Sequence, residues 1–204
     1  MKTVPAFLVL LTGCLVLIQP AIAEETWPSW RGPRGDGSSP DQTVPLEWNV
    51  KEHTVWKTPL PGKGHASPVV WQDHVFVVTA VEDRRELICL DRSTGEKKWV
   101  AIVLNSPRER IHRRNSLASS TPVTDGDHVF VSFLDGEEMH VAAYDFDGKK
   151  QWEKRPGVFS SVHGYCSSPI LWKDKVIING DHDGDSYIVA LEKKNGKEAW
   201  KTMR

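Results

Sequence analysis

The 204-residue sequence contains little cysteine, methionine or tyrosine and carries almost no net charge. Three cysteines are too few for a disulfide-rich scaffold. A formal net charge of −1 and a pI near 6.7 exclude the strong positive charge with which proteins bind a nucleic-acid backbone. Beyond the N-terminus, no apolar run approaches the roughly 20 residues of a membrane-spanning helix. The composition therefore predicts neither a nucleic-acid partner nor a spanning helix.

The N-terminus has the pattern of a targeting segment. Lys2 precedes an apolar stretch over residues 5–18, and Ala21-Ile22-Ala23 matches the small-x-small cleavage rule. We predict a signal peptide over residues 1–23 and export to the periplasm or the extracellular space. The alternative is a lipoprotein box over residues 11–14, which would anchor the chain to a membrane through a lipid on Cys14. Against it, the apolar run continues beyond this cysteine.

Cleavage leaves two cysteines, Cys89 and Cys166. In an oxidising compartment such a pair can form a bridge. Cys89 lies within one repeat and Cys166 just before the repeat two units later, so we favour two unpaired thiols and keep the bridge as the alternative.

Tryptophan, in contrast, is abundant, with nine residues, and marks a repeat. Three copies span residues 67–99, 121–152 and 168–200. Each has a Ser/Thr-Pro pair near its start and a Trp at its end, 30 or 31 residues after the proline. The aligned residues are Ser67, Thr121 and Ser168; Pro68, Pro122 and Pro169; and Trp99, Trp152 and Trp200. Such a regular register predicts a repeat protein.

Each copy contains four short runs of β-branched residues separated by turn residues, which predicts four strands. A glycine between the third and fourth runs stands four residues before the Trp, at Gly95, Gly148 and Gly196. Four antiparallel strands in about 50 residues are typical of a β-propeller blade. We expect each terminal Trp to pack structurally against a neighbouring unit.

The expected organisation is a signal peptide (1–23), an N-terminal arm (24–58) and propeller blades (59–204, as 66–103, 119–155 and 167–204). In the arm, Trp27, Trp30 and Arg31 are expected anchors. Trp56-Lys57-Thr58 has the same sequence as Trp200-Lys201-Thr202, so residues 53–58 are predicted to be the outer strand of an incomplete blade.

The fold class is therefore an all-β partial propeller of three four-stranded blades plus one extra N-terminal outer strand. Closed propellers use about four to eight blades. The sequence thus predicts an N-terminal fragment of a longer propeller. Its open edges are expected to self-associate.

The motif Leu90-Asp91-Arg-Ser-Thr-Gly95 to Trp99 resembles the tryptophan-docking repeat of quinoprotein (PQQ-type) propellers, as do its counterparts ending at Trp152 and Trp200. The arm Trp27-Pro-Ser-Trp30-Arg-Gly-Pro and the segment at 115–122 resemble the exported PQQ-like repeat proteins abundant in planctomycete bacteria. In architecture, the repeats are similar to the outer-membrane-assembly BamB family.

The resemblance implies two functions. A BamB-like protein would be an exported, non-catalytic scaffold that binds protein or another cell-envelope macromolecule, without a cofactor; this is our leading hypothesis. A PQQ-dependent dehydrogenase would carry adjacent cysteines, Ca²⁺ ligands and an Asp base. No matching cluster can be assigned here, so the chain is not expected to be an enzyme. Binding of carbohydrate or a small ligand in the central channel remains a third hypothesis.

The longest connector between blades is rich in arginine. Four Arg and one His within seven residues are suited to grip a carboxylate, a phosphate or an acidic partner through forked hydrogen bonds. The alternative is a solvated insertion balanced by nearby acidic loops. The residues are Arg108, Arg110, His112, Arg113 and Arg114.

His65, His112 and His163 lie in connectors leading toward the central axis and, with the arginines, are candidate partner-binding residues. A histidine cluster there would suit a metal ion. Their unequal offsets from the prolines favour unrelated loop histidines. Residues 181–185 resemble a Ca²⁺ loop but have Ser186 where such a loop needs glycine, so a charged turn is preferred. We predict no metal site.

Overall fold

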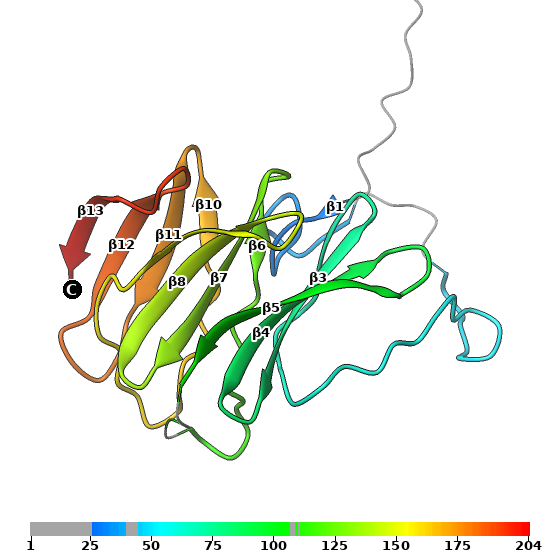
Figure 1. The fold of residues 1–204 in the computed structure, drawn as a ribbon, viewed down its shortest axis with the longest axis horizontal. Helices are drawn as coiled ribbons and strands as arrows, with labels where there is room; N and C mark the ends of the chain where they lie inside the picture. Colours follow the sequence, from blue (N-terminus) through cyan, green and yellow to red (C-terminus); the bar gives the residue numbers. More distant parts are fainter. Residues whose placement is uncertain (1–25, 40–44, 107–108, 110) are drawn as a thin grey trace, which may run out of the picture.

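The computed structural model describes residues 26–39, 45–106, 109 and 111–204. Within these residues the chain is all-β, with thirteen strands and no helix (Figure 1). The strands form three antiparallel sheets in which neighbours along the chain are neighbours in the sheet. No helix in this part of the chain is long and apolar enough to cross a membrane. The protein is a partial β-propeller.

Each repeat folds into one blade whose strands run in order from the inner to the outer edge. Blade 1 consists of β2 (Val69–Trp71), β3 (His74–Val81), β4 (Arg84–Asp91) and β5 (Lys97–Asn105). Blade 2 consists of β6 (Val123–Thr124), β7 (His128–Asp135), β8 (Glu138–Asp145) and β9 (Lys150–Lys154). Blade 3 consists of β10 (Ile170–Trp172), β11 (Lys175–Gly180), β12 (Tyr187–Glu192) and β13 (Glu198–Met203).

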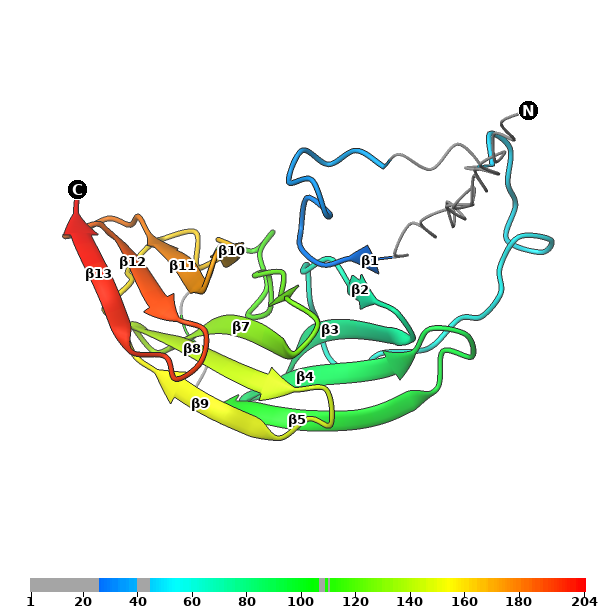
Figure 2. The ribbon, with the colours of Figure 1, turned by 90° about the horizontal axis from the view of Figure 1, so that it is seen from above.

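Seen from above, the blades stand side by side along a crescent (Figure 2). The outer strands β5, β9 and β13 lie along the convex rim, and the short strands β2 and β10 lie on the concave side. The turns between second and third strands and the connectors between blades share one edge, because both leave a blade at the same strand end. We call this edge the connector face.

The N-terminal arm differs from the prediction in its strand and in its anchors. Residues 53–58 form no strand, and no described strand lies beside them to supply hydrogen-bond partners. The arm instead contributes β1 (Thr26–Trp27), which pairs with β2 at the inner edge and makes blade 1 five-stranded. Of the three expected anchors, only Trp27 joins the body, as part of β1. Trp30 is 56% exposed and Arg31 lies over its ring, so these two side chains do not pin the arm.

The Trp at the end of each unit packs against the next unit. The indole N–H of Trp99 donates to Phe146 O at 2.7 Å, and that of Trp152 donates to Lys193 O at 2.7 Å. Trp56 makes the equivalent contact with Arg92 O at 2.8 Å, although its segment forms no strand. Each acceptor is the residue after the Asp or Glu that ends a third strand.

The motif requires glycine at this position for two physical reasons. Gly148 has φ +81°, which disfavours a side chain, and a Cβ there would lie 2.8 Å from the Trp99 ring. Gly95 and Gly196 lie equally close beneath Trp56 and Trp152. The repeat therefore pairs a turn that needs glycine with an indole that needs a flat surface.

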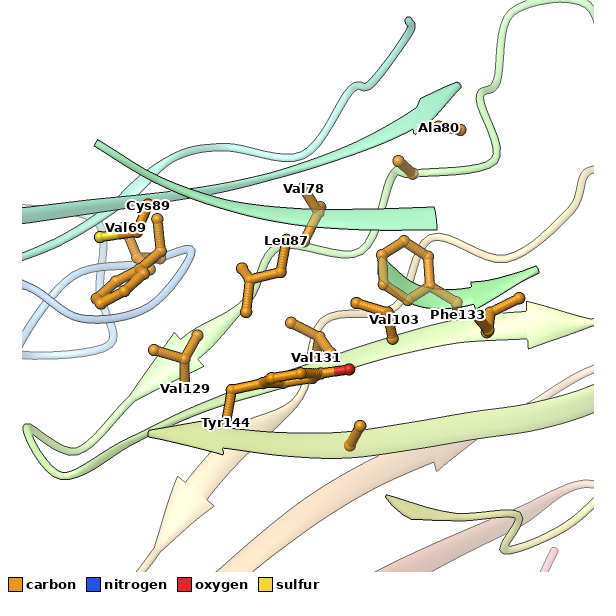
Figure 3. Close-up of a cluster of buried hydrophobic side chains, with 14 residues drawn as sticks. Val69, Val78, Ala80, Leu87, Cys89, Val103, Val129, Val131, Phe133 and Tyr144 are labelled. Atoms are coloured by element: carbon orange, nitrogen blue, oxygen red, sulfur yellow. The ribbon is translucent and has the colours of Figure 1, made fainter. Parts of the chain in front are cut away.

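Two apolar cores lie between the blades rather than within one sheet. The first joins Val69, Phe76 and Leu87 of blade 1 to Val131 and Tyr144 of blade 2 (Figure 3). The second joins blades 2 and 3. Because strand residues alternate between the two faces, β7 and β8 of blade 2 each supply both cores, which fixes the blades relative to one another.

The outward face of blade 3 keeps large apolar side chains exposed. Trp71 of blade 1 packs on Gly126 of blade 2, whereas its counterpart Trp172 is 65% exposed. Trp200 is 44% exposed, although its counterparts Trp99 and Trp152 are docked. The two tryptophans thus present an interface that no described residue covers.

Candidate functional site

The connector face is built by backbone hydrogen bonds between the connectors and the turns that end the second strands. Ser106 N–H donates to Asp83 O at 2.8 Å, and Phe159 N–H donates to Glu137 O at 2.7 Å. Asp183 N–H donates to Ser160 O at 3.0 Å. The connectors therefore follow the blade ends closely, and their side chains occupy defined positions above the concave side.

The structure places part of the predicted arginine cluster on this face. His112, Arg113 and Arg114 are exposed. Arg108 and Arg110 lie outside the described residues. The connector is tied to the next connector, between blades 2 and 3, by Asn115, whose side-chain amide donates to His163 O at 2.7 Å.

Two of the three connector histidines come together, contrary to the expectation from their unequal offsets. The rings of His112 and His163 lie 5.6 Å apart between centroids in an edge-to-face arrangement. The Asn115–His163 bond explains this convergence, because it draws the two connectors together. His65 instead lies on the blade 1 side, where its backbone N–H donates to Ala118 O at 3.0 Å. Among the described residues no group of three His, Cys, Asp or Glu side chains is arranged to hold a metal ion.

A buried ion pair anchors the same connector. Glu109 Oε1 lies 3.2 Å from Arg85 Nη2, and the side chains are 8% and 0% exposed. Burial raises the pKa of the Glu109 carboxyl, to about 7, against the opposing effect of the Arg85 guanidinium. Removing one partner of such a pair leaves an uncompensated buried charge and costs roughly 3–5 kcal/mol. The pair therefore holds the connector against blade 1.

Two clefts of opposite charge flank the connector. The first, of about 590 Å³, is lined by Lys63, His65 and Arg113 together with the apolar Val77 and Val78. The second, of about 470 Å³, is lined by acidic side chains and by Phe159. The carboxylates in the second cleft are Glu109, Glu137 and Asp183. We call them the basic cleft and the acidic cleft.

Between the clefts, buried hydroxyl groups form a chain. Ser120 Oγ and Ser132 Oγ lie 2.8 Å apart, and Ser132 Oγ lies 3.0 Å from the Tyr165 hydroxyl. Burial raises the pKa of the Tyr165 hydroxyl well above its usual range. The adjoining cavity of about 10 Å³ has room for one water molecule. The chain closes the floor of the connector face rather than opening a reactive group to a substrate.

The two cysteines have different environments. Cys89 is buried between blades 1 and 2, where burial raises the pKa of its thiol to about 12, and Cys166 is exposed in a connector. Both are free thiols. A pyrroloquinoline quinone with Ca²⁺ would need the adjacent cysteines and the carboxylate set that the family resemblance implies. The described residues do not fit that group.

Sequence analysis missed Lys63, Arg85 and Glu109. Arg85 shares the alternating face of Leu87 and Cys89 on β4, and that period was a usable signal. No pattern connects Lys63 to Arg113, which is 50 positions away in the chain.

Comparisons with known proteins agree with this architecture. A family model described as outer membrane protein assembly factor BamB matches residues 51–203, three quarters of the chain. No curated protein matches the sequence significantly.

Two solved dehydrogenase structures share the fold. A europium-containing methanol dehydrogenase is 17% identical, with a TM-score of 0.53, over 72% of this chain and 26% of its own. A quinohemoprotein alcohol dehydrogenase from Comamonas testosteroni is 18% identical, with a TM-score of 0.50, over 70% of this chain and 21% of its own. BamB from Moraxella catarrhalis is 18% identical, with a TM-score of 0.46, over 72% of this chain and 42% of its own. The chain thus spans about a quarter of the length of the two dehydrogenases.

Proposed function

Because this chain belongs to the family described as outer membrane protein assembly factor BamB, we propose that it is an exported, non-catalytic scaffold. Its role is to bind a protein or another macromolecule of the cell envelope through the connector face. The signal-peptide pattern of residues 1–23 supports export. A lipid on Cys14 would add a membrane anchor under the alternative processing.

The observation that carries the proposal is that the docking contacts and the connectors lie at opposite ends of each blade. The docking contacts lie at the turns between third and fourth strands, where Trp99 and Trp152 join neighbouring units. The connectors lie at the opposite strand ends and differ in length between blades. Loops of variable length on a rigid scaffold are typical binding elements.

The side chains on the connector face support binding rather than catalysis. Its charged groups are spread over two clefts, and the buried hydroxyl chain is occupied by internal hydrogen bonds. Its floor is held by the Arg85–Glu109 pair. A surface of this kind suits a large partner that covers both clefts. Carbohydrate or small-ligand binding in the channel would use one cleft alone.

Site-specific photo-cross-linking in cells tests the proposal. A photoreactive residue at His163 or Arg114, both exposed on the connector face, should give a discrete adduct with an envelope component. The same residue at Lys154, exposed on the outer strand β9, is the matched control. Adducts from Lys154 but from neither connector position would refute the proposed surface.

The enzyme alternative has its own test. The purified chain is mixed with pyrroloquinoline quinone and Ca²⁺, and dye reduction is followed with alcohols and sugars. We expect no substrate-dependent reduction. A rate that depends on both the quinone and a substrate would replace the scaffold function with a dehydrogenase.

A further inference from the structure

The basic cleft is held by backbone contacts although its charged side chains are exposed. Lys63 N–H donates to Ala80 O at 3.0 Å, and Ala80 N–H donates to Lys63 O at 2.9 Å. His65 and Ala66 both donate their N–H groups to Ala118 O, at 3.0 and 3.1 Å. The strip carrying Lys63 and His65 is therefore fixed between β3 and the connector, and the cleft is preformed.

The charge of this cleft is unbalanced. Lys63, His65 and Arg113 line it, and no carboxylate is among its lining residues. None of the three side chains forms an ion pair or a hydrogen bond within the part of the chain that the structure describes. The other polar side chains at this wall are engaged, since Asn115 bonds to His163 O and Ser116 Oγ lies 2.8 Å from Ser119 Oγ.

The wall between the basic side chains is apolar. Leu60, Pro61, Ala66 and Pro68 supply this apolar lining, and Leu60 is 41% exposed. A low-polarity wall reduces the screening of nearby charges and strengthens their attraction for a ligand of opposite charge. Arg113 supplies a planar fork that bonds an oxyanion through two N–H groups, and Lys63 supplies a point charge.

We propose that the basic cleft binds an oxyanion, a carboxylate or a phosphate group, between Lys63, His65 and Arg113. The inference rests on the proposed function, because it assigns to the scaffold's partner the group that enters this cleft. The acidic cleft on the other side of the connector repels the same group through Glu137 and Asp183, since the Glu109 carboxyl is paired with Arg85. A partner would therefore be oriented, with its anionic group on the blade 1 side.

Calorimetric titration of the purified full chain tests the site with two probes, inorganic phosphate and a hexaglutamate peptide. We expect at least one to bind, with an affinity that falls as salt rises. The preferred probe identifies the source of the oxyanion. Lys63→Gln and Arg113→Gln should each weaken binding by roughly 10-fold, since a charge-assisted hydrogen bond is lost. Both substitutions keep the backbone contacts, and circular dichroism confirms the fold.

Two matched controls make the test specific. Arg114→Gln removes an exposed arginine of the same connector that does not line the cleft, and Glu137→Gln removes a charge from the acidic cleft. Neither should weaken binding of the probes. Loss of affinity in Arg114→Gln equal to that in Arg113→Gln, or no binding of either probe, overturns the site.

The titration tests the oxyanion site separately from the scaffold function, which is tested by cross-linking. Cross-links from His163 that persist while neither probe binds would refute the oxyanion site and leave the scaffold in place. Specific probe binding without any cross-linked partner would refute the scaffold and leave the oxyanion site in place.

Discussion

The backbone N–H of Thr121 donates a 3.0 Å hydrogen bond to Ser168 Oγ, and the Thr121 hydroxyl itself accepts a 3.0 Å bond from Ser67 N–H. These three residues occupy the same position in successive repeats, immediately before the proline of each copy. The Ser/Thr-Pro pair is therefore an inter-blade link along the concave side. Its hydroxyl oxygen accepts the hydrogen bond from the backbone N–H of the preceding repeat. A hydroxyl there joins each blade to its neighbour.

Replacement of Thr121 by Val should destabilise the chain. Thr121 is 2% exposed, so the isosteric change leaves the Ser67 N–H without its acceptor in a buried place. The expected loss in the free energy of unfolding is about 1–3 kcal/mol, measured by urea denaturation. Thr121→Ser keeps the hydroxyl and should lose less. Equal losses in the two variants would show that the link contributes little.

The docking tryptophans should differ in their contribution although they share a repeat position. Trp152 is 8% exposed and bonds to Lys193 O, so Trp152→Ala should cost roughly 3–5 kcal/mol of unfolding free energy. Trp200 is 44% exposed, and Trp200→Ala should cost well under half as much. The comparison uses denaturation curves of the 204-residue chain. Similar losses would contradict the docking account.

His140 should make stability depend on pH. It is 1% exposed between blades 1 and 2, neither ring nitrogen has a partner within the described chain, and burial lowers its pKa from 6.5 to about 4. Arg155 and Lys150 act in the same direction, while Glu153 and Asp135 oppose them. The unfolded state therefore binds more protons between about pH 4 and 6.5.

The stabilising effect of a neutral His140 is present above about pH 6.5 and is lost as the pH falls toward 4, by roughly 3 kcal/mol in total. Denaturation at several pH values measures it. His140→Leu should flatten this part of the curve without a loss at neutral pH, because no hydrogen bond is broken. His53→Leu, at an exposed site, is the control. An unchanged pH profile in His140→Leu would contradict the assignment.

The outward face of blade 3 should make the 204-residue chain self-associate. Ile170, Trp172 and Trp200 are between 44% and 65% exposed and lie on β10 and β13. Trp172→Glu should lower the sedimentation coefficient at high protein concentration, since a charge opposes apolar contact. Trp48→Glu changes an equally exposed tryptophan of the arm, 67%, and should have no such effect. Identical behaviour of both variants would exclude this face from association.

Much of the fold followed from the repeat. The glycine-to-tryptophan spacing of four residues and the β-branched runs were enough to predict three four-stranded blades, because turn chemistry and strand period act locally. The outer strand at 53–58 was not formed, since a strand depends on a neighbour that local sequence does not supply. The added strand β1 has only two residues, too few for any pattern.

The connector face was only partly predictable. The arginine-rich composition identified the connector, but the meeting of His112 with His163 depends on a bond from Asn115 to a carbonyl 48 positions away. The pairing of Arg85 with Glu109 depends likewise on the path of the connector. Such contacts are set by tertiary packing, which no local spacing encodes.

Hydrogen–deuterium exchange of the chain, with and without the component recovered by cross-linking, tests most directly that the connector face is the binding surface. The account predicts added protection in residues 61–66, 111–117, 157–164 and 181–185, and unchanged exchange in β5, β9 and β13. Protection confined to those outer strands, with none in the connectors, would contradict it.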